Sequence, residues 1–236
     1  MEQCPMKDKF VIITNQRSGS NLLVSMLNSH PQIKCFGELM RATPRWMKIK
    51  GYRGALTVLE KVDAVYKDDR HRFANPGEFV QAVFDTAPRR SKTCGFKLHL
   101  NQHPEYLFQL IHDPQWKLIV LERVNKLAQF SSRKITEITG QGNAPKGSKI
   151  KRATVEFNSQ EFARFVQREA KDWEKVRTEI SASGKNHFSV QYAELLVKEV
   201  MQDLLGFLGA DPSVDVEPGT EKRNPSAILE RFSNSE

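Results

Sequence analysis

The chain has little cysteine: Cys4, Cys35 and Cys94 are its only three cysteines in 236 residues. Three scattered thiols are too few for a disulfide framework or a zinc site, so we expect reduced thiols and a cytoplasmic protein. Long apolar runs are also lacking, and we expect neither a signal peptide nor a transmembrane segment. No cluster of carboxylates that could hold Mg²⁺ stands out in the sequence, and we expect no metal.

What is present fits one globular domain over residues 1–236. The hydrophobic fraction of 39% is sufficient for a sizeable core, and no repeat or low-complexity tract interrupts the chain. The 36 Lys and Arg residues outnumber the 28 Asp and Glu residues, which gives a net charge of +8. This excess favours anionic partners, whether polyanions or small molecules.

The most informative stretch is residues 10–27. It opens with four consecutive apolar residues, turns through Gln16-Arg-Ser-Gly-Ser-Asn21 and continues with apolar residues at helical spacing. The pattern predicts a buried parallel strand, a tight loop and a helix. Gly19 permits a positive φ in the loop, and the serines and Asn21 suit a helix N-terminus. Backbone N–H groups there would bind an anion, and the Arg17 guanidinium would grip its oxygens.

This loop differs from that of the nucleotide triphosphatases. Their pattern is Gly, four residues, then Gly-Lys-Ser/Thr, and here neither the first glycine nor the lysine is present. Arg17 takes the place of the lysine. The residues therefore predict a phosphate- or sulfate-binding loop of another kind, with a plain strand, turn and serine-capped helix as the alternative.

The rest of the chain alternates strand and helix patterns. We predict strands over 33–36, 93–100, 117–123 and 187–192, and helices over 20–29, 55–65, 76–86, 104–112, 125–138, 158–181 and 195–208, with a loop over 139–151. Such alternation predicts an α/β protein with a P-loop-like three-layer fold, in which helices flank a mostly parallel sheet. The carboxyl ends of the strands would then bring the phosphate loop, Glu38, Lys97 and Arg123 into one crevice.

Residues 41–90 are the least informative part. Basic residues alternate there with aromatic ones: Arg45, Trp46, Lys48, Lys50, Tyr52 and Arg53. This mixture is compatible with nucleic-acid contact, but we favour a helical insertion that binds an acceptor, with a solvated outer face.

Two features together resemble the sulfotransferases that use 3′-phosphoadenosine-5′-phosphosulfate (PAPS). One is the loop Arg17-Ser-Gly-Ser-Asn21 after the first strand. The other is Arg123 at the end of a central strand, followed eight residues later by Ser131. The resemblance implies that the loop holds the 5′-phosphosulfate, and that Arg123 and Ser131 hold the 3′-phosphate. The segments 188–209 and 221–226 are similar to the family's last strand and helix and to its basic C-terminal segment.

The resemblance also implies a donor site and an acceptor class. Its cofactor-binding residues would be Arg17, Ser18, Gly19, Ser20, Asn21, Arg123, Ser131, Tyr192, Lys222 and Arg223. Arg17 in the loop, and Phe-Gly-Glu-Leu39 after the first helix, look like the bacterial carbohydrate- and lipid-modifying members of the nodulation-factor type. Gln16 and Asn21 depart from the family, which often has Pro and Ser or Thr there. The acceptor would be a glycan, glycolipid or small molecule, with no nucleic-acid partner.

For the reaction, we predict that Arg17 and Lys97 neutralise charge on the sulfuryl group and that Glu38 is the general base. His99 and His103 are the rival bases. The sequence leaves two other functions open. A kinase would need a phosphate-loop lysine and a magnesium carboxylate, and a nucleic-acid binder rests on charge alone.

Overall fold

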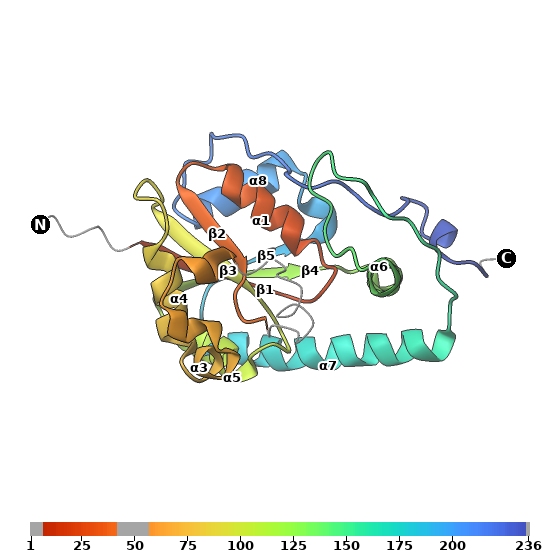
Figure 1. Cartoon of the computed structure of the whole chain (residues 1–236), viewed down its shortest axis with the longest axis horizontal. Helices are drawn as coiled ribbons and strands as arrows, with labels where there is room; N and C mark the ends of the chain where they lie inside the picture. The colour runs from red at the N-terminus through yellow and green to blue at the C-terminus, as the bar shows by residue number, and fades with distance from the viewer. Residues whose placement is uncertain (1–6, 42–56, 235–236) are drawn as a thin grey trace, which may run out of the picture.

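The apolar run that follows Asp8 forms the central strand of a parallel sheet. The computed structural model describes residues 7–41 and 57–234, and Figure 1 shows its sheet between two layers of helices. The strands are β1 (Asp8–Thr14), β2 (Ile33–Glu38), β3 (Thr93–His99), β4 (Trp116–Glu122) and β5 (His187–Gln191). They pair in parallel in the order β2-β3-β1-β4-β5. Their carboxyl ends therefore share one edge.

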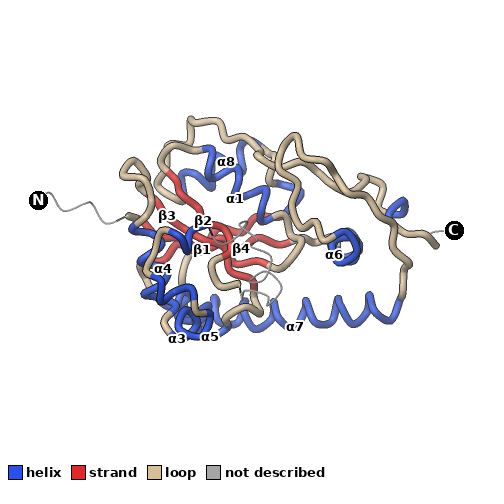
Figure 2. Tube along the Cα trace, in the orientation of Figure 1, coloured by secondary structure: helices blue, strands red, loops and turns tan. Residues whose placement is uncertain are grey.

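The alternation of side chains along β1 divides the core into two layers. Phe10 and Ile12 pack with α1 (Ser20–Ser29) and α8 (Lys198–Phe207). Val11 and Ile13 pack on the opposite face with α4 (Pro76–Asp85), α5 (Pro104–His112) and α7 (Ser159–Ser183). Both faces of the strand are buried, which is why its sequence is continuously apolar. The predicted α/β fold with three layers is confirmed (Figure 2).

Helix α6 (Lys126–Thr139) lies beyond the carboxyl end of β4 and contacts α7. Asn125 caps it by accepting a hydrogen bond from Ala128 N (2.9 Å), and Asn158 caps α7 by accepting from Glu161 N (2.9 Å). These caps begin the helices where the asparagines predict. The chain after α6 and the C-terminal segment run side by side above α6 (Figure 1).

One predicted helix is wrong. In place of a helix over 55–65 the described residues form two short 3₁₀ helices, η1 (Thr57–Glu60) and η2 (Ala64–Lys67), and then α3 (Asp69–Ala74). The reason is local capping. Asp63 accepts a hydrogen bond from Val65 N and begins η2, and Asp68, where η2 ends, accepts one from Arg70 N and begins α3.

The last helix also begins later than predicted. After β5 the chain forms a 3₁₀ turn, η3 (Tyr192–Glu194), which is fixed by a reciprocal capping box between Gln191 and Glu194. α8 starts only at Lys198, after Val197 has returned to an extended conformation. The turn directs Tyr192 back toward the loop after β1. A short 3₁₀ turn, η4 (Leu229–Arg231), follows in the tail.

Some predictions fall on residues outside the described ranges. They concern Cys4 and the basic and aromatic residues Arg45, Trp46, Lys48, Lys50, Tyr52 and Arg53. Cys35 and Cys94 are described, and both are buried free thiols. Across 7–41 and 57–234, no helix combines the length and the apolar character needed to cross a membrane.

Candidate active site

The loop between β1 and α1 turns through two residues with positive φ. Gly19 has φ 90° and is the N-cap of α1, and Arg17 has φ 64°. A Cβ atom at Gly19 would overlap the Tyr192 ring, so the close approach of η3 requires glycine at this position. The loop thus packs directly beneath Tyr192, with the first N–H groups of α1 at its end.

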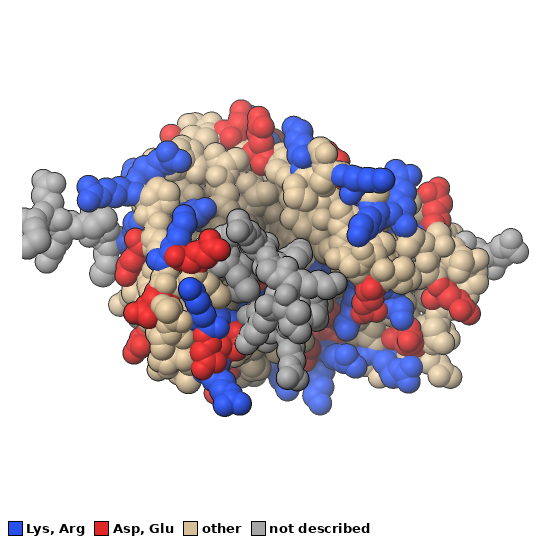
Figure 3. All heavy atoms as spheres, viewed as in Figure 1, with Lys and Arg blue, Asp and Glu red and all other residues tan. Residues whose placement is uncertain are grey.

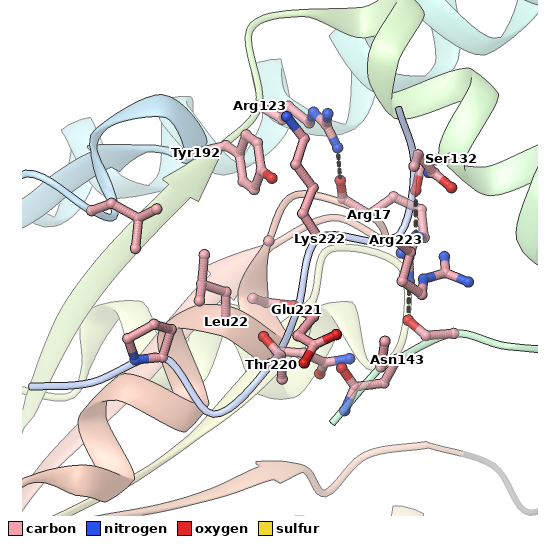
Figure 4. Close-up of a pocket in the computed structure, with 18 of the residues that line it drawn as sticks. Arg17, Leu22, Arg123, Ser132, Asn143, Tyr192, Thr220, Glu221, Lys222 and Arg223 are labelled. Atoms are coloured by element: carbon pink, nitrogen blue, oxygen red, sulfur yellow. Dashed lines mark hydrogen bonds between the residues drawn. The ribbon is translucent and has the colours of Figure 1, made fainter. Parts of the chain in front are cut away.

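Five cationic side chains surround a cavity of about 370 Å³ above this loop (Figure 4). They are Arg17, Arg123, Lys222, Arg223 and Arg231. The cations come from four separate stretches of chain, which only the fold brings together. Figure 3 shows Lys and Arg side chains gathered over the loop that follows α6 and the C-terminal segment. Such a concentration of positive charge suits a ligand with several anionic groups.

Arg17 is held in this cavity by neutral acceptors. Its Nε donates to Ser132 Oγ (3.0 Å) and its Nη1 donates to the Gly142 carbonyl. Burial, together with the nearby Arg223 and Arg123, lowers the pKa of Arg17 to about 10, although Tyr192 opposes this shift. The guanidinium therefore remains charged at neutral pH in a partly desolvated site, where a bound anion is strongly favoured.

Arg123 lies at the carboxyl end of β4, as predicted. Its Nη1 donates to the Arg17 carbonyl (3.2 Å), and its guanidinium stacks 4.3 Å from the centre of the Tyr192 ring. Burial lowers the pKa of Arg123, while Tyr192 opposes the shift. Arg123 therefore connects the loop after β1 to η3 and leaves part of its guanidinium directed at the cavity.

Ser131 is completely buried behind the cavity. Its hydroxyl donates to the Ala128 carbonyl (3.2 Å) and accepts from Arg231 Nη1 (3.2 Å). The next residue, Ser132, lines the cavity. The structure thus brings Arg123 to the cavity wall and links Ser131 to it through Arg231.

The C-terminal segment closes one side of the cavity. Arg223 is buried, and it donates to the Gln141 carbonyl and to Thr136 Oγ1 (2.9 Å). Lys222, in contrast, is exposed. Backbone hydrogen bonds from Lys146 N to Gly219 O (3.1 Å) and from Glu221 N to Ala144 O (2.9 Å) pair this segment with the loop after α6. The two segments form one cover over the cavity.

Glu38 ends β2 on the other side of the loop. Its Oε2 lies 3.6 Å from Lys97 Nζ, its Oε1 lies 3.7 Å from His99 Nδ1, and Gln102 Nε2 donates to Oε1. Lys97 Nζ also donates to Asn21 Oδ1 (2.6 Å). Lys97 therefore joins the carboxylate to the first turn of α1.

The charges in this cluster are fixed by burial and by one another. Burial opposes the charge on Glu38, but Lys97, followed by His99, Arg41 and the hydrogen bond from Gln102, holds the pKa of Glu38 below its ordinary value. Burial also lowers the pKa of Lys97, which Glu38 counteracts. At neutral pH the site thus contains a carboxylate ready to accept a proton.

The two histidines have different surroundings. Burial lowers the pKa of His99 to about 4, so its ring is neutral at pH 7, and neither ring nitrogen has a hydrogen-bond partner among the described residues. His103 instead caps α5. Its Nδ1 accepts from Tyr106 N (3.2 Å) and its Nε2 lies 2.9 Å from the Phe73 carbonyl. These contacts of His103 involve neither Glu38 nor the loop after β1.

Comparison with known proteins identifies the family. Residues 9–213 match the model of the Sulfotransferase family. The chain belongs to this family. A sulfotransferase from Alicyclobacillus acidocaldarius has 15% sequence identity and a TM-score of 0.46, and the match covers 95% of this chain and 89% of that chain. A crystal structure of retinol dehydratase in a complex with retinol and PAP has 14% identity and a TM-score of 0.41, and the match covers 98% of this chain and 68% of that chain. No curated protein matches significantly.

Family membership decides between the functions that the sequence left open. The protein is a PAPS-dependent sulfotransferase, and neither a kinase nor a non-enzymatic nucleic-acid binder. Among 7–41 and 57–234, no group of three or more His, Cys, Asp or Glu side chains is arranged to hold a metal ion. The absence of a metal remains a prediction.

Sequence reasoning missed several residues of this candidate site. Arg231, Ser132 and Asn143 line the cavity, and Gln102 binds Glu38. Arg231 is one of many basic residues in the chain, and its only local signal is a turn in the tail. Ser18 is buried beneath the loop and does not line the cavity, whereas Gly19, Ser20 and Asn21 do.

Proposed function

We propose that the sulfotransferase transfers a sulfuryl group from PAPS to a hydroxyl group of a carbohydrate, glycolipid or other small-molecule acceptor. One observation carries the proposal. The Glu38 carboxylate lies 3.6 Å from Lys97 Nζ, and the same ammonium donates to Asn21 at the end of the anion-binding loop. A base and a cation thus stand together beside the proposed position of the sulfuryl group. A carboxylate suits a sugar hydroxyl, whose proton it accepts as the oxygen attacks.

The donor is assigned to the cationic cavity. Arg17 and the backbone of Ser18, Gly19, Ser20 and Asn21 are proposed to hold the 5′-phosphosulfate at the N-terminus of α1. Arg123 and Ser131 are proposed to hold the 3′-phosphate, with Arg231 joining them through its hydrogen bond to Ser131 (3.2 Å). Tyr192, Lys222 and Arg223 complete the proposed nucleotide site. The five cations of the cavity support this assignment because PAPS carries anionic groups at both ends.

In the proposed reaction the acceptor oxygen attacks sulfur, and a new S–O bond forms. The bond between sulfur and the bridging phosphate oxygen breaks, and 3′,5′-adenosine bisphosphate (PAP) leaves. Glu38 takes the acceptor proton, while Lys97 and Arg17 neutralise charge on the transferred and leaving oxygens. The neutral ring of His99 is the alternative base, and His103 is a weaker one because its Nδ1 caps α5 and its Nε2 lies 2.9 Å from the Phe73 carbonyl.

The acceptor is assigned to the side of β2 and β3, where residues 41–90 would form a helical insertion within the single domain 1–236. Its described part packs on the sheet through Phe84, whose ring stacks on Phe36 at 5.7 Å. That contact supports a position of the proposed insertion beside β2, the strand that carries Glu38. We propose the cytoplasm as the location, which the free buried thiols of Cys35 and Cys94 support.

The test uses purified protein, labelled PAPS and a panel of glycans, glycolipids and phenols. We expect radiolabel transfer to hydroxyl groups of the first two classes and retention of the protein on immobilised PAP. Transfer restricted to phenols would overturn the acceptor class. A protein that is not retained on PAP would overturn the donor assignment.

A further inference from the structure

A buried polar cluster lies directly behind the loop after β1. Glu169 Oε2 on α7 accepts hydrogen bonds from Asn15 Nδ2 (2.8 Å) and from Gln129 Nε2 (3.1 Å). The three residues come from β1's end, α6 and α7, and each is at most 9% exposed. Asn15 follows Val11 and Ile13 on the face of β1 that packs on α7. The cluster is therefore separate from the cavity on the α1 side of the loop.

Glu169 is an unusual residue for its position. The buried side chains of α7 are Phe165, Trp173, Val176 and Ile180 in addition to Glu169. At the helical spacing of this row an apolar residue would extend the core. A carboxylate there loses hydration that only good hydrogen-bond partners replace. Its two hydrogen-bond donors indicate that Glu169 is there to hold Asn15 and Gln129 in place.

Both donors lead to the loop. Asn15 immediately precedes the turn, and Gln129 Nε2 donates a second hydrogen bond to the Gln16 carbonyl (2.9 Å). Next in the chain, Arg17 is the sole non-glycine residue with positive φ among those described. A left-handed conformation is unfavourable for an arginine and persists only where the surrounding structure imposes it. The bonds from Asn15 to Glu169 on α7 and from Gln129 on α6 to Gln16 hold the two residues that precede Arg17.

We propose that Glu169 is a positioning residue for the donor loop: through Asn15 and Gln129 it fixes the left-handed turn at Arg17. The fixed turn directs the Arg17 side chain to Ser132 and to the cavity. The expected effect on PAPS binding rests on the proposed function, whereas the effect on the conformation of the loop does not. Helix α7 thus contributes to donor binding although none of its residues lines the cavity.

A single oxygen carries both hydrogen bonds, so the acceptor atom matters more than the second carboxylate oxygen. Glutamine retains one acceptor oxygen at this place, whereas methionine fills a similar volume and has none. Lys126 Nζ lies 4.0 Å from the same oxygen and makes no hydrogen bond within the described part of the chain. The Lys126 ammonium can lie beside either the carboxylate of Glu169 or the amide oxygen of a glutamine at this position.

The experiment compares Glu169→Met and Glu169→Gln with the matched control Glu174→Met, which is exposed on the same helix. Amide hydrogen exchange over residues 15–19 is measured without nucleotide, and PAP binding is measured by calorimetry. We expect Glu169→Met to speed exchange and weaken PAP binding, each about tenfold, as for a lost hydrogen bond to a charged group. Glu169→Gln and the control should stay within about threefold of wild type.

Three outcomes would overturn the inference or separate it from the proposed function. The inference would be overturned if Glu169→Met exchanged its amides and bound PAP as the wild type does. It would also be overturned if the variant had a lower melting temperature but no faster exchange over residues 15–19. If Glu169→Met does not fold, Gln129→Met removes the bonds to Gln16 and Glu169, and the same pattern is expected. If Glu169→Met speeds exchange over the loop but the wild-type protein does not bind PAP, the positioning role is supported and the donor assignment is overturned.

Discussion

Lys97 and Glu38 face each other across neighbouring strands, with Lys97 Nζ 3.6 Å from Glu38 Oε2. The two residues are register partners in the parallel pairing of β2 and β3. Their contact therefore follows from the sheet itself, with Gly37 (φ 73°) turning the strand end toward the site. Because both groups are largely buried, their attraction is less screened than on a surface. The proposed base is kept ionised by the same cation that is proposed to meet the sulfuryl group.

The first prediction concerns Glu38 as the base. Glu38→Gln keeps the shape of the side chain and its contact with Gln102 but removes its capacity to accept a proton. We expect kcat to fall about 10²–10⁴-fold, the usual contribution of a general base, with PAP affinity unchanged. Steady-state kinetics and calorimetry measure the two quantities. The matched control is Glu105→Gln, an exposed residue on α5. A change confined to the KM of the acceptor would make Glu38 a positioning residue and leave His99 as the base.

The second prediction concerns the anchors of the donor. Arg17→Ala and Arg123→Ala should each weaken PAP binding by about 1.5–3 kcal/mol, the range for charge-assisted hydrogen bonds. Ser131→Ala should cost less because its hydroxyl contacts Arg231 and Ala128 behind the cavity. Calorimetry of each variant gives the values, with the exposed Arg152→Ala as the control. Normal PAP binding by Arg123→Ala would contradict the assignment of the 3′-phosphate to the end of β4.

Much of this site could be predicted from sequence because its residues follow strands. Continuous apolar runs identify buried parallel strands, and parallel strands present their carboxyl ends at one edge, so Glu38, Lys97 and Arg123 were expected there. Arg231 could not be predicted in this way. It reaches Ser131 from a hundred residues further along the chain, from the short turn η4.

The prediction of a helix over 55–65 was wrong because of a local interaction, in contrast to the long-range contact of Arg231. Its apolar spacing is helical, but the aspartate side chain of Asp63 competes for the backbone N–H of Val65. The adjacent residues Ser131 and Ser132 illustrate a further limit. The resemblance to the sulfotransferases pointed to Ser131, yet a helix turns by about 100° per residue, and Ser132 is the one that lines the cavity.

The third prediction uses the electrostatic coupling of Lys97 to Glu38. Burial raises the proton affinity of Glu38, and Lys97 is the largest influence that opposes it and lowers the pKa. Lys97→Met should therefore raise the pKa of Glu38 and move the acid limb of the kcat/KM profile to higher pH. A profile with an unmoved acid limb would show that another group controls this limb.

The same pair predicts how stability depends on pH. A carboxyl whose folded pKa is lowered stabilises the fold above its unfolded pKa, and this stabilisation is lost as pH falls through the folded pKa. Denaturant unfolding of wild type should therefore show a loss of stability below pH 4.5 that is smaller in Glu38→Gln. Identical acid dependence in the two proteins would contradict the ionised, coupled state of Glu38.

The last prediction concerns the cover formed by the C-terminal segment and the loop after α6. Arg223 is anchored by hydrogen bonds to Gln141 and Thr136, whereas Lys222 is exposed and donates to Ser226 Oγ (2.9 Å). We expect PAP to slow amide exchange over residues 219–224, because a bound anion would add contacts to a cover that is already paired with Ala144 and Lys146.

The two neighbouring cations separate this effect from simple attraction of charge. Both Lys222→Ala and Arg223→Ala remove one positive charge, so long-range attraction for PAP falls equally in both. Only Arg223→Ala also releases the loop after α6. PAP affinity should fall more than about tenfold in Arg223→Ala and less in Lys222→Ala, since an exposed charge contributes about 0–1 kcal/mol. Equal losses in the two variants, or exchange over 219–224 that PAP leaves unchanged, would mean that this segment is a solvated terminus and not part of the donor site.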